Sequence, residues 1–380
     1  MAGGRLTIKN KVVHITSVHD PFDVRIFYKE CKSLRKAGYD VVLVAAGERF
    51  TNVEGITIKT VPKAYNRFTR IVRTSWMLYK KALKEEAAIY HIHDPELILI
   101  GLLIRLSGTK VIYDVHEDVP KQILGKSWIW CPFRTTISNI FNLVEKAISK
   151  HFDAIVTATS SIAERFYEIN KNVVVVKNFP VCDEFNCITP NDNNYLKRSN
   201  CIVYIGGITE IRGLREIIKA IGLVDSSYSH KLILGGKFEN DTFEKEITSL
   251  EEWSLVDFKG WLNRDQVAEV LQRSRAGLVL LYPAANYLES LPVKMFEYMA
   301  AGLPVIASNF PYWKEIVNGN QCGLTVDPKD PVAIASAIKY IFDHPKEAEA
   351  MGQRGREAVL QKYNWKNEEK KLLKLYAKLL

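Results

Sequence analysis

The two halves of the chain follow the same pattern, in which apolar runs of strand length alternate with amphipathic stretches of helical length. Runs that are apolar at consecutive positions predict strands buried on both faces of a parallel sheet, with helices on each side. The predicted strands of the first half are Lys11–Val18, Asp40–Ala46, Ala88–His93, Lys110–Val115 and Ala154–Ala158. Those of the second half are Cys201–Ile205, His230–Leu234, Val256–Lys259, Ala276–Leu281 and Leu303–Ala307. The sequence therefore predicts an α/β protein with two doubly wound parallel sheets.

Length and composition agree with two domains. A chain of 380 residues is too long for one ordinary core, and 47% hydrophobic with 25% charged residues is typical of a soluble globular protein. Asn178-Phe179-Pro180 and the polar run Thr189–Asn200 mark the expected connection between the domains.

The net charge indicates which classes of partner to expect, and the cysteine spacing indicates the redox state of the compartment. The net charge of +9 indicates acidic partners such as nucleotides, nucleic acid or anionic lipid. The six cysteines lack CxxC spacing, which argues against a zinc site and a disulfide framework and favours a reducing compartment. No apolar signal segment opens the sequence, and the longest apolar run, Leu97–Ile104, is too short to span a bilayer.

Histidine stands beside a carboxylate at three predicted strand ends, in His19-Asp20, His93-Asp94 and His116-Glu117. Because ligands of such sheets bind at the carboxyl ends of strands, these pairs predict a polar cleft rather than three unrelated caps. His91-x-His93 is the best metal candidate, since alternate strand residues share a face. Packing of one of the two against a helix is the favoured interpretation, and we predict no metal site.

Two stretches combine basic and aromatic residues, Arg67–Lys84 and Lys121–Arg134. Lysine and arginine interleaved with tryptophan suit a membrane interface. The alternative is a helix whose aromatic residues lie in the core and whose charges are solvated. That alternative is at least as good for the first stretch, whereas Trp128 and Trp130 lie in an irregular segment and favour the membrane for the second.

Glycine follows several predicted strands of the second half, in Gly206-Gly207, Gly235-Gly236 and Gly260-Trp261. Glycine lets the backbone approach a ligand closely. The turn Ile208–Gly213 then opens a predicted helix through Ile221, which makes Arg212 and this turn a phosphate contact. The spacing is neither that of a P-loop nor a G-x-G-x-x-G fingerprint.

Two glutamates, Glu289 and Glu297, frame the next predicted helix. Ser290 is the expected N-cap, Pro292 a first-turn residue and Gly302 the end of the helix. The glutamates lie roughly 12 Å apart at most, whereas glycosidase carboxylates are about 5–9.5 Å apart. Their spacing suits the two ends of a long ligand, such as a diphosphate with a hydroxylated group at each end.

Lys294 lies in the first turn, where the helix dipole favours anions. A ligand anion on the helix N-terminus explains this position, and so does a surface pair with Glu297, three residues later. The sequence leaves both explanations open.

The paired glutamates, the following Gly302-x-Pro304 and the Gly-Gly-x4-Arg-Gly turn make the whole chain resemble glycosyltransferase family 4, retaining enzymes of the GT-B fold. The resemblance implies two Rossmann-like domains with a cleft between them, and a donor held mainly by the C-terminal one. We therefore expect an acceptor-side domain over 1–180 and a nucleotide-sugar-binding domain over 181–363. A final helix over 364–380 would cross back to the first domain.

The resemblance also implies residue roles. Glu297 would hold the ribose hydroxyls and Glu289 the donor-sugar hydroxyls, while the backbone at Ser290 and Leu291 would face the diphosphate. Arg212 takes the place of a lysine in the family's glycine-rich turn. The other donor-binding candidates are Gly206, Gly207, Gly236, Trp261 and Lys294.

His116, in Asp114-Val115-His116-Glu117, matches a family histidine near the sugar and the reacting centre. His116 and Glu289 are therefore the candidate catalytic residues. The acceptor-side candidates are His19, Asp20, Asp23, Arg25, His93 and Asp94.

Two positions depart from the family pattern. Gly207 stands where members often have arginine, and Lys294 can replace the missing phosphate cation. The loop His19–Arg25 replaces a common glycine pair, so acceptor specificity does not transfer. Transferases of the other common architecture hold a metal with Asp-x-Asp, which this sequence lacks. Cationic side chains and a helix dipole can do the same work on a leaving diphosphate, so we expect no metal and no cofactor.

The sequence thus predicts a retaining, metal-independent hexosyl- or N-acetylhexosaminyl-transferase that uses a nucleoside-diphosphate sugar and a glycan or lipid-linked acceptor. Surface polysaccharide or glycoconjugate synthesis is the expected role. We expect the cytoplasm or the inner face of the membrane as its location, an anionic membrane contact through Lys121–Arg134, and no nucleic-acid partner. The alternatives are a nucleotide-sugar epimerase on the same fold and a non-catalytic scaffold subunit that holds a membrane or partner.

Overall fold

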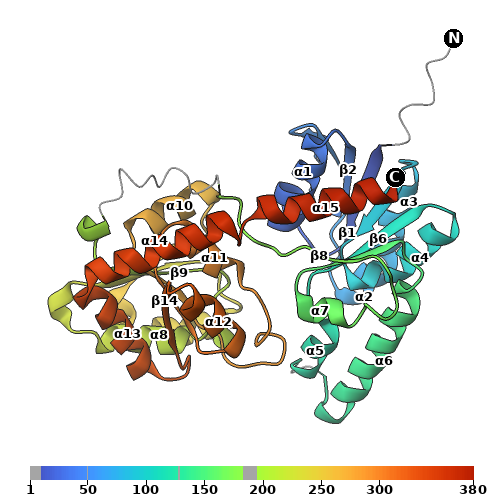
Figure 1. The fold of residues 1–380 in the computed structure, drawn as a ribbon. Helices are drawn as coiled ribbons and strands as arrows, with labels where there is room; N and C mark the ends of the chain where they lie inside the picture. The colour runs from blue at the N-terminus through green and yellow to red at the C-terminus, as the bar shows by residue number, and fades with distance from the viewer. Residues whose placement is uncertain (1–9, 49, 127–128, 183–194) are drawn as a thin grey trace. The chain divides into compact units, whose positions relative to one another are not determined.

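The computed structural model describes residues 10–48, 50–126, 129–182 and 195–380, which fold as two compact units. The first unit contains the described residues up to Asn178 together with Trp365–Leu380, and the second contains Phe179–Asn364 (Figure 1). Phe179, expected in the first domain, packs instead in the second unit, where its ring centroid lies 4.7 Å from that of Phe296. The first half of the predicted connection Thr189–Asn200 lies outside the described residues.

The first unit is built on an eight-stranded sheet in the order β3-β4-β2-β1-β5-β6-β7-β8. The strands are β1 (Lys11–Thr16), β2 (Asp40–Ala46), β3 (Asn52–Val53), β4 (Ile56–Val61), β5 (Ile89–Ile92), β6 (Lys110–Val115), β7 (Ala154–Thr157) and β8 (Val173–Val175). Only the β3–β4 pair is antiparallel. The strands predicted in this half are confirmed to within two residues at each end, and the predicted parallel sheet is present.

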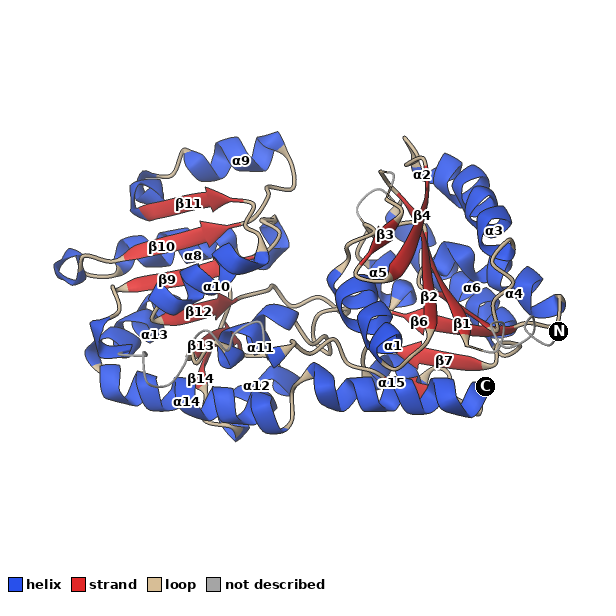
Figure 2. Ribbon diagram, turned by 90° about the horizontal axis from the view of Figure 1, so that it is seen from above, coloured by secondary structure: helices blue, strands red, loops and turns tan. Residues whose placement is uncertain are grey.

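Helices cover both faces of this sheet (Figure 2). The π-helical η1 (Val24–Cys31), α1 (Lys32–Lys36) and α15 (Trp365–Leu379) lie on one face. The other elements are α2 (Arg67–Thr69), η2 (Arg70–Thr74), α3 (Ser75–Leu83), η3 (Pro95–Leu97), α4 (Ile98–Leu106), α5 (Val119–Leu124), α6 (Cys131–Ser149) and α7 (Ser160–Glu164). Val13 and Ile15 of β1 join the core beneath α3 and α4, whereas the intervening His14 faces α15, as strand alternation requires. None of the described helices is long and apolar enough to cross a bilayer.

The C-terminal segment forms two helices, and the second of them is the helix expected over 364–380. α14 (Pro345–Gln361) belongs to the second unit and α15 to the first. Trp365 Nε1 donates to Ser33 Oγ at 2.9 Å, and the backbone N–H of Lys177 donates to Glu368 Oε2 at 2.9 Å. α15 is therefore tied into the first unit by both its side chains and the backbone next to it.

The second unit has a six-stranded parallel sheet in the order β11-β10-β9-β12-β13-β14. The strands are β9 (Cys201–Ile205), β10 (Lys231–Gly235), β11 (Val256–Gly260), β12 (Ala276–Val279), β13 (Val305–Ser308) and β14 (Gly323–Val326). The helical elements are η5 (Tyr195–Lys197), η6 (Glu210–Arg212), α8 (Leu214–Leu223), η7 (Ser226–Tyr228), α9 (Asp241–Thr248), η8 (Glu251–Leu255), α10 (Arg264–Arg273), α11 (Val293–Ala300), α12 (Pro311–Gly319), α13 (Pro331–Asp343) and α14. The chain order along the sheet reverses between β9 and β12, which is where such folds bind ligands.

α11 packs closely on the sheet at this reversal. Tyr298 is fully buried, and its hydroxyl accepts a hydrogen bond from the backbone N–H of Ile205 at 2.8 Å, at the end of β9. Gly277 on β12 makes room for the ring, because a Cβ there would lie 2.2 Å from Tyr298 Cδ2. The glycine therefore allows α11 to approach the ends of the central strands.

We predict that Gly277→Ala destabilises the protein by about 1–3 kcal/mol, because the added methyl group overpacks a filled site. Gly319→Ala is the matched control, since nothing lies within 4 Å of a Cβ at that position in α12. Thermal unfolding followed by circular dichroism should show a lower midpoint for Gly277→Ala only. Equal midpoints for the two variants would contradict the packing of α11.

Candidate functional site

The backbone segments that follow β9 and β10 approach each other closely at two glycines, near the point where the strand order of the second sheet reverses. Gly206 and Gly236 follow β9 and β10 with φ of 138° and 152°, in the region that favours glycine. A Cβ on Gly236 would lie 1.9 Å from the carbonyl oxygen of Gly206. The two predicted glycine ends are thus packed backbone against backbone, which no larger residue at position 236 would permit.

Two cationic side chains meet beside these glycines. A Cβ on Gly206 would lie 2.9 Å from Lys294 Nζ and 3.4 Å from Arg212 Nη1. Arg212 Nη1 also donates to the carbonyl oxygen of Gly207 at 3.2 Å. The structure thus brings Arg212, at the end of η6, and Lys294, in the first turn of α11, to the end of β9.

The ammonium group of Lys294 is buried, and the described residues give its Nζ no hydrogen-bond partner. It lies 3.8 Å from the ring centroid of Tyr204, whose quadrupole attracts a cation. Burial and the neighbouring Arg212 charge hold the pKa of Lys294 well below its ordinary value, although Glu297 acts in the opposite direction. An anion bound here would satisfy both cations.

The start of α11 differs from the prediction. The helix begins at Val293 with Pro292 as its N-cap residue, at φ −68° and ψ 119°. Ser290 is therefore not the cap, and its hydroxyl donates instead to the carbonyl oxygen of Tyr287 at 2.9 Å. With Pro292 extended and no side chain capping the helix, the first amide groups of α11 are not satisfied by Ser290. The predicted C-terminal signal is present, since Gly302 has φ 69°.

Glu297 does not form the surface pair with Lys294 that the sequence left open. Its Oε1 accepts a hydrogen bond from Arg264 Nη1 at 2.8 Å, from the start of α10. Glu289 lies in the loop before α11 and is exposed. The two glutamates therefore have different surroundings, one half-buried in an ion pair and one open to solvent.

The remaining predicted donor residues surround this region. The carbonyl oxygen of Ser290 accepts from Trp313 Nε1 at 2.8 Å, and Leu291 packs against the core of the unit. Trp261 follows β11 and is 76% exposed, although Trp usually finds a packing partner. A large exposed aromatic ring at a strand end is available to stack on a ligand ring.

The first unit holds a second cluster, centred on Asp114 at the end of β6. Arg25 Nε and Nη2 donate to its two carboxylate oxygens at 3.0 and 2.9 Å. His116 Nε2 lies 2.8 Å from Asp114 Oδ2, and His93 Nδ1 lies 3.3 Å from the same oxygen. Burial alone would raise the pKa of Asp114, but the Arg25 charge and His116 hold it well below its ordinary value. Asp114 is thus an anion that orients His116.

The acceptor-side candidates divide into two groups. His19 joins the cluster: its ring lies 5.0 Å from that of His116, with Asp23 Oδ2 at 3.3 Å and Asp94 Oδ1 at 3.5 Å. Burial lowers the pKa of His19, but these carboxylates outweigh burial and raise it. Asp20 lies apart, exposed and 3.4 Å from Lys63.

Asp94 is fixed by the backbone at the end of β1. Its Oδ2 accepts from the backbone N–H of Ser17 at 2.6 Å and from Thr16 Oγ1 at 2.8 Å. Asp94 and His19 therefore belong to the neighbouring strand ends of β5 and β1, where the order of the first sheet reverses. The three predicted histidine–carboxylate strand ends do converge on one place.

A layer of buried polar groups lies beneath this cluster. His14 Nδ1 is 2.8 Å from His93 Nε2, and the hydroxyl of Tyr376 is 2.8 Å from His91 Nδ1. Burial lowers the pKa of His93 to about 4 and raises that of Glu30 well above its ordinary value. Two groups of described residues could hold a metal ion: His14, Glu30, His91 and His93, and His93, Asp114 and His116. Hydrogen bonds join several of these residues directly, as between His14 and His93 and between His116 and Asp114.

Several residues of the two sites were not singled out from the sequence. Asp114 lies two residues before His116, so strand alternation could have placed both on one face. Arg264, Tyr204 and Tyr376 reach their partners from distant segments, and no local pattern marks them. Trp128 of the predicted membrane segment lies outside the described residues.

Comparisons with known proteins match both units. The model described as "Glycosyltransferase Family 4" matches residues 24–180, and that described as "Glycosyl transferases group 1" matches residues 189–358, so together they cover most of the chain. An uncharacterized glycosyltransferase of Methanocaldococcus jannaschii, MJ1607, is 26% identical over 46% of this chain. The match spans 44% of that protein, less than half of its length.

Two solved structures share the fold over nearly the whole chain. The sucrose-phosphate synthase of Thermosynechococcus elongatus has a TM-score of 0.77 at 17% identity, covering 98% of this chain and 99% of its own. Anabaena HepE in complex with UDP-glucose has a TM-score of 0.74 at 10% identity, covering 97% and 99%. The two family models and the two parallel-sheet units agree: this chain belongs to glycosyltransferase family 4 and has the GT-B fold.

Proposed function

We propose that the protein is a retaining transferase that moves a hexosyl or N-acetylhexosaminyl group from a nucleoside-diphosphate sugar to a glycan or lipid-linked acceptor. The family supports glycosyl transfer, and a protein of similar fold was solved with UDP-glucose bound. A role in surface polysaccharide or glycoconjugate synthesis follows from such an acceptor.

One observation carries the donor assignment: the buried Lys294 ammonium has no hydrogen-bond partner among the described residues and lies beside a second cation, Arg212. A buried polar group without a hydrogen-bond partner is costly, and a bound anion would supply the partner and favour the protonated form of Lys294. The ligand must be anionic. Because the cations lie at the first turn of α11 and at the glycine ends of β9 and β10, a diphosphate matches both the charge and the open backbone.

In the proposed reaction the bond between the anomeric carbon and the diphosphate oxygen breaks, and the acceptor hydroxyl forms the new bond on the same face. Arg212, Lys294 and the α11 N-terminus stabilise the charge that develops on the leaving diphosphate. The acceptor proton passes to the departing phosphate. Glu289 would hold the sugar hydroxyls, and Glu297 would exchange part of its contact with Arg264 for the ribose hydroxyls.

The first unit would serve the acceptor. His116 is held by the Asp114 carboxylate at 2.8 Å, and its side chain is 13% exposed whereas those of Asp114 and His93 are fully buried, so its other edge is available to a substrate. His19, Asp23, Arg25, His93 and Asp94 would position or orient it, and Asp20 stands outside this group.

We also propose that the enzyme works in the cytoplasm at the inner face of the membrane, with Lys121–Arg134 touching anionic lipid. Within this segment Trp130 is 71% exposed and packs on Phe133, with their ring centroids 5.3 Å apart.

The reaction itself is tested by product analysis with nucleoside-diphosphate sugars. We expect donor-dependent growth of an acceptor with retained anomeric configuration, and turnover that survives EDTA because Arg212 and Lys294 replace a metal. Epimerised donor without acceptor would favour the epimerase. Loss of activity in EDTA with rescue by Mg²⁺ or Mn²⁺ would contradict the metal-independent mechanism, and an absence of any turnover would favour a scaffold.

We predict that a nucleoside diphosphate binds with uptake of a proton. The pKa of Lys294 is lowered in the free protein, and a nearby anion raises it, so the amine gains a proton at a pH between its free and bound pKa values. Calorimetry above neutral pH in buffers of different ionisation enthalpy measures this uptake. The Lys294→Arg variant, whose guanidinium stays protonated, should bind the nucleoside diphosphate without this proton uptake. An uptake unchanged in Lys294→Arg would contradict the assignment.

Substitutions of the two glutamates should have different effects on diphosphate affinity and on turnover. Glu297→Gln should weaken a free nucleoside diphosphate by about 1.5–3 kcal/mol, the range for a hydrogen bond to a charged group. Glu289→Gln should leave that affinity unchanged but lower kcat with the full donor, because a misplaced anomeric carbon loses its reactive geometry.

Arg264→Gln is the control for this comparison, since it removes the partner of Glu297 without removing the carboxylate. Arg264→Gln should weaken binding of the nucleoside diphosphate by less than Glu297→Gln does. If the two glutamate variants lose diphosphate affinity equally, the direction assigned to the donor is wrong.

A further inference from the structure

The outer helices of the first unit expose apolar side chains in regular stripes. In α2, η2 and α3 these are Phe68, Val72 and Trp76; in α4 they are Leu99, Leu103 and Leu106. The spacings of four, or of four and three, residues place each set on one side of its helix. The sequence of Arg67–Lys84 left open a core position for these aromatic residues, but Phe68 is 77% exposed. These side chains face solvent instead.

α6 shows the same feature in its clearest form, because its polarity is inverted. Ile137, Ile140 and Val144 are exposed, whereas Ser138 and Glu145 are buried. The buried polar groups are satisfied inside the unit. Ser138 Oγ donates to the carbonyl oxygen of Pro120 at 2.8 Å, and Glu145 accepts from Tyr113 and Arg165. A helix normally buries its apolar side, so the outward side of α6 is built for an apolar partner.

The three stripes belong to one surface. α4 packs against both α3 and α6, on the side of the sheet opposite α15 (Figure 2). We call the exposed side chains of α2, η2, α3, α4 and α6 the outer helical face. In the second unit the exposed residues Leu223, Val332 and Leu360 lie singly on three separate helices. Apolar surface gathered over several neighbouring helices marks an interaction site.

Charge identifies the partner. In the sequence of the five elements that form the outer helical face, Glu145 is the only acidic residue, and it is buried. Their charged residues are otherwise all cationic: Arg67, Arg70, Arg73, Lys80, Lys81, Arg105, Arg134 and Lys146. A second copy of a chain with net charge +9 would be repelled by this surface. An anionic bilayer supplies both the apolar interior and the negative headgroups.

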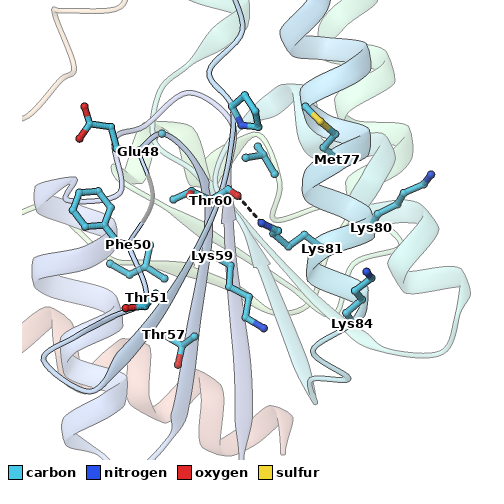
Figure 3. Close-up of a pocket in the computed structure, with 14 residues that line it drawn as sticks. Glu48, Phe50, Thr51, Thr57, Lys59, Thr60, Met77, Lys80, Lys81 and Lys84 are labelled. Carbon is cyan, nitrogen blue, oxygen red and sulfur yellow. Dashed lines mark hydrogen bonds between the residues drawn. The ribbon is translucent and has the colours of Figure 1, made fainter.

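A basic cavity adjoins the same helices. It has a volume of about 880 Å³ and lies between β4 and α3, lined by Lys59, Lys80, Lys81 and Lys84 (Figure 3). Lys81 is fixed by donating to the carbonyl oxygen of Thr60 at 2.6 Å, and Lys59 pairs with Glu85. Lys80 Nζ lies 5.5 Å from the ring centroid of Trp76, so Lys80 and Lys84 place positive charge directly beside the apolar stripes. A lipid headgroup phosphate has the charge and the position that this cavity requires.

We propose that the outer helical face seats the protein on an anionic lipid bilayer, with headgroup phosphates bound by the lysines of the β4–α3 cavity. The contact extends well beyond the segment Lys121–Arg134, of which it includes only the start of α6. It also does not depend on the proposed sugar transfer, because it can be measured without donor or acceptor.

Co-sedimentation of the full chain with vesicles tests this contact. The vesicles are phosphatidylcholine alone, or phosphatidylcholine with roughly a third phosphatidylglycerol. We expect binding to the anionic vesicles only, and weaker binding at high salt. Leu103→Glu/Ile140→Glu should reduce partitioning by about tenfold or more, since two apolar side chains leave the lipid. The matched control, Leu223→Glu/Val332→Glu, places the same changes at exposed positions of the second unit and should bind as the unmodified protein does.

A second variant, Lys80→Glu/Lys84→Glu, alters charge without touching the apolar stripes, so the proposal stays testable if the first variant unfolds. It should abolish the preference for anionic over neutral vesicles. Circular dichroism checks that each variant is folded. The proposal is overturned if the unmodified protein does not bind anionic vesicles, or if face and control variants bind equally. A dimer in sedimentation equilibrium that Leu103→Glu/Ile140→Glu disrupts, without vesicle binding, would assign the face to a second copy instead.

Discussion

The hydrogen bond between the backbone N–H of Ile205 and the hydroxyl of Tyr298 joins the central strand of the second unit to the helix that carries the candidate donor site. Gly277 makes that contact possible by leaving space for the tyrosine ring. Because this contact holds α11 against the sheet, Lys294 in the first turn of α11 lies beside Arg212 and the glycines that follow β9 and β10. A packing constraint in the core thus produces an electrostatic one at the end of β9, where the buried amine of Lys294 lies beside the Arg212 cation and a bound anion would relieve their repulsion.

The first unit differs from the second in that its buried cation, Arg25, is paired with a carboxylate. Arg25 and Asp114 form a bidentate pair in the interior, and Arg25 also donates to the carbonyl oxygen of Val176 at 2.8 Å. A buried ion pair contributes little net stability by itself, because desolvation offsets the attraction. Its value here is positional. The pair fixes a carboxylate at the end of β6, and that carboxylate fixes the ring of His116 at the carboxyl ends of the strands.

The sequence predicted the parts of this architecture that depend on local patterns. Strands such as β2 and β6 are continuous apolar runs, and both were placed correctly. β4 was missed because Lys59 and Thr60 interrupt its apolar residues, as suits a strand near the sheet edge. β14 was missed because Gly323 and Thr325 interrupt its apolar residues, and β8 has only three residues.

Within the sites, the prediction ended where contacts become non-local. The histidine–carboxylate strand ends and the anion-favouring position of Lys294 were visible in the sequence. The partner of Glu297 was not, because Arg264 lies 33 positions away in the chain. Arg25 and Asp114 are separated by 89 positions. The error at Ser290 was of another kind: Pro292 holds an extended conformation, so the helix starts later than the nearest cap-forming side chain suggests.

The placement of α15 has a consequence for how the chain is made. The helix that covers His14 and His91 through Tyr376, and that anchors Lys177 through Glu368, comes after the whole second unit in the chain and is synthesised after it. Its buried face includes Leu372 and Leu375, which need the rest of the first unit before they can leave water. The first unit is therefore begun first and finished last, and the second unit can fold in the interval. During that interval the histidine layer is open on the side that α15 later closes, so the layer beneath the acceptor-side cluster is covered only once α15 has been synthesised.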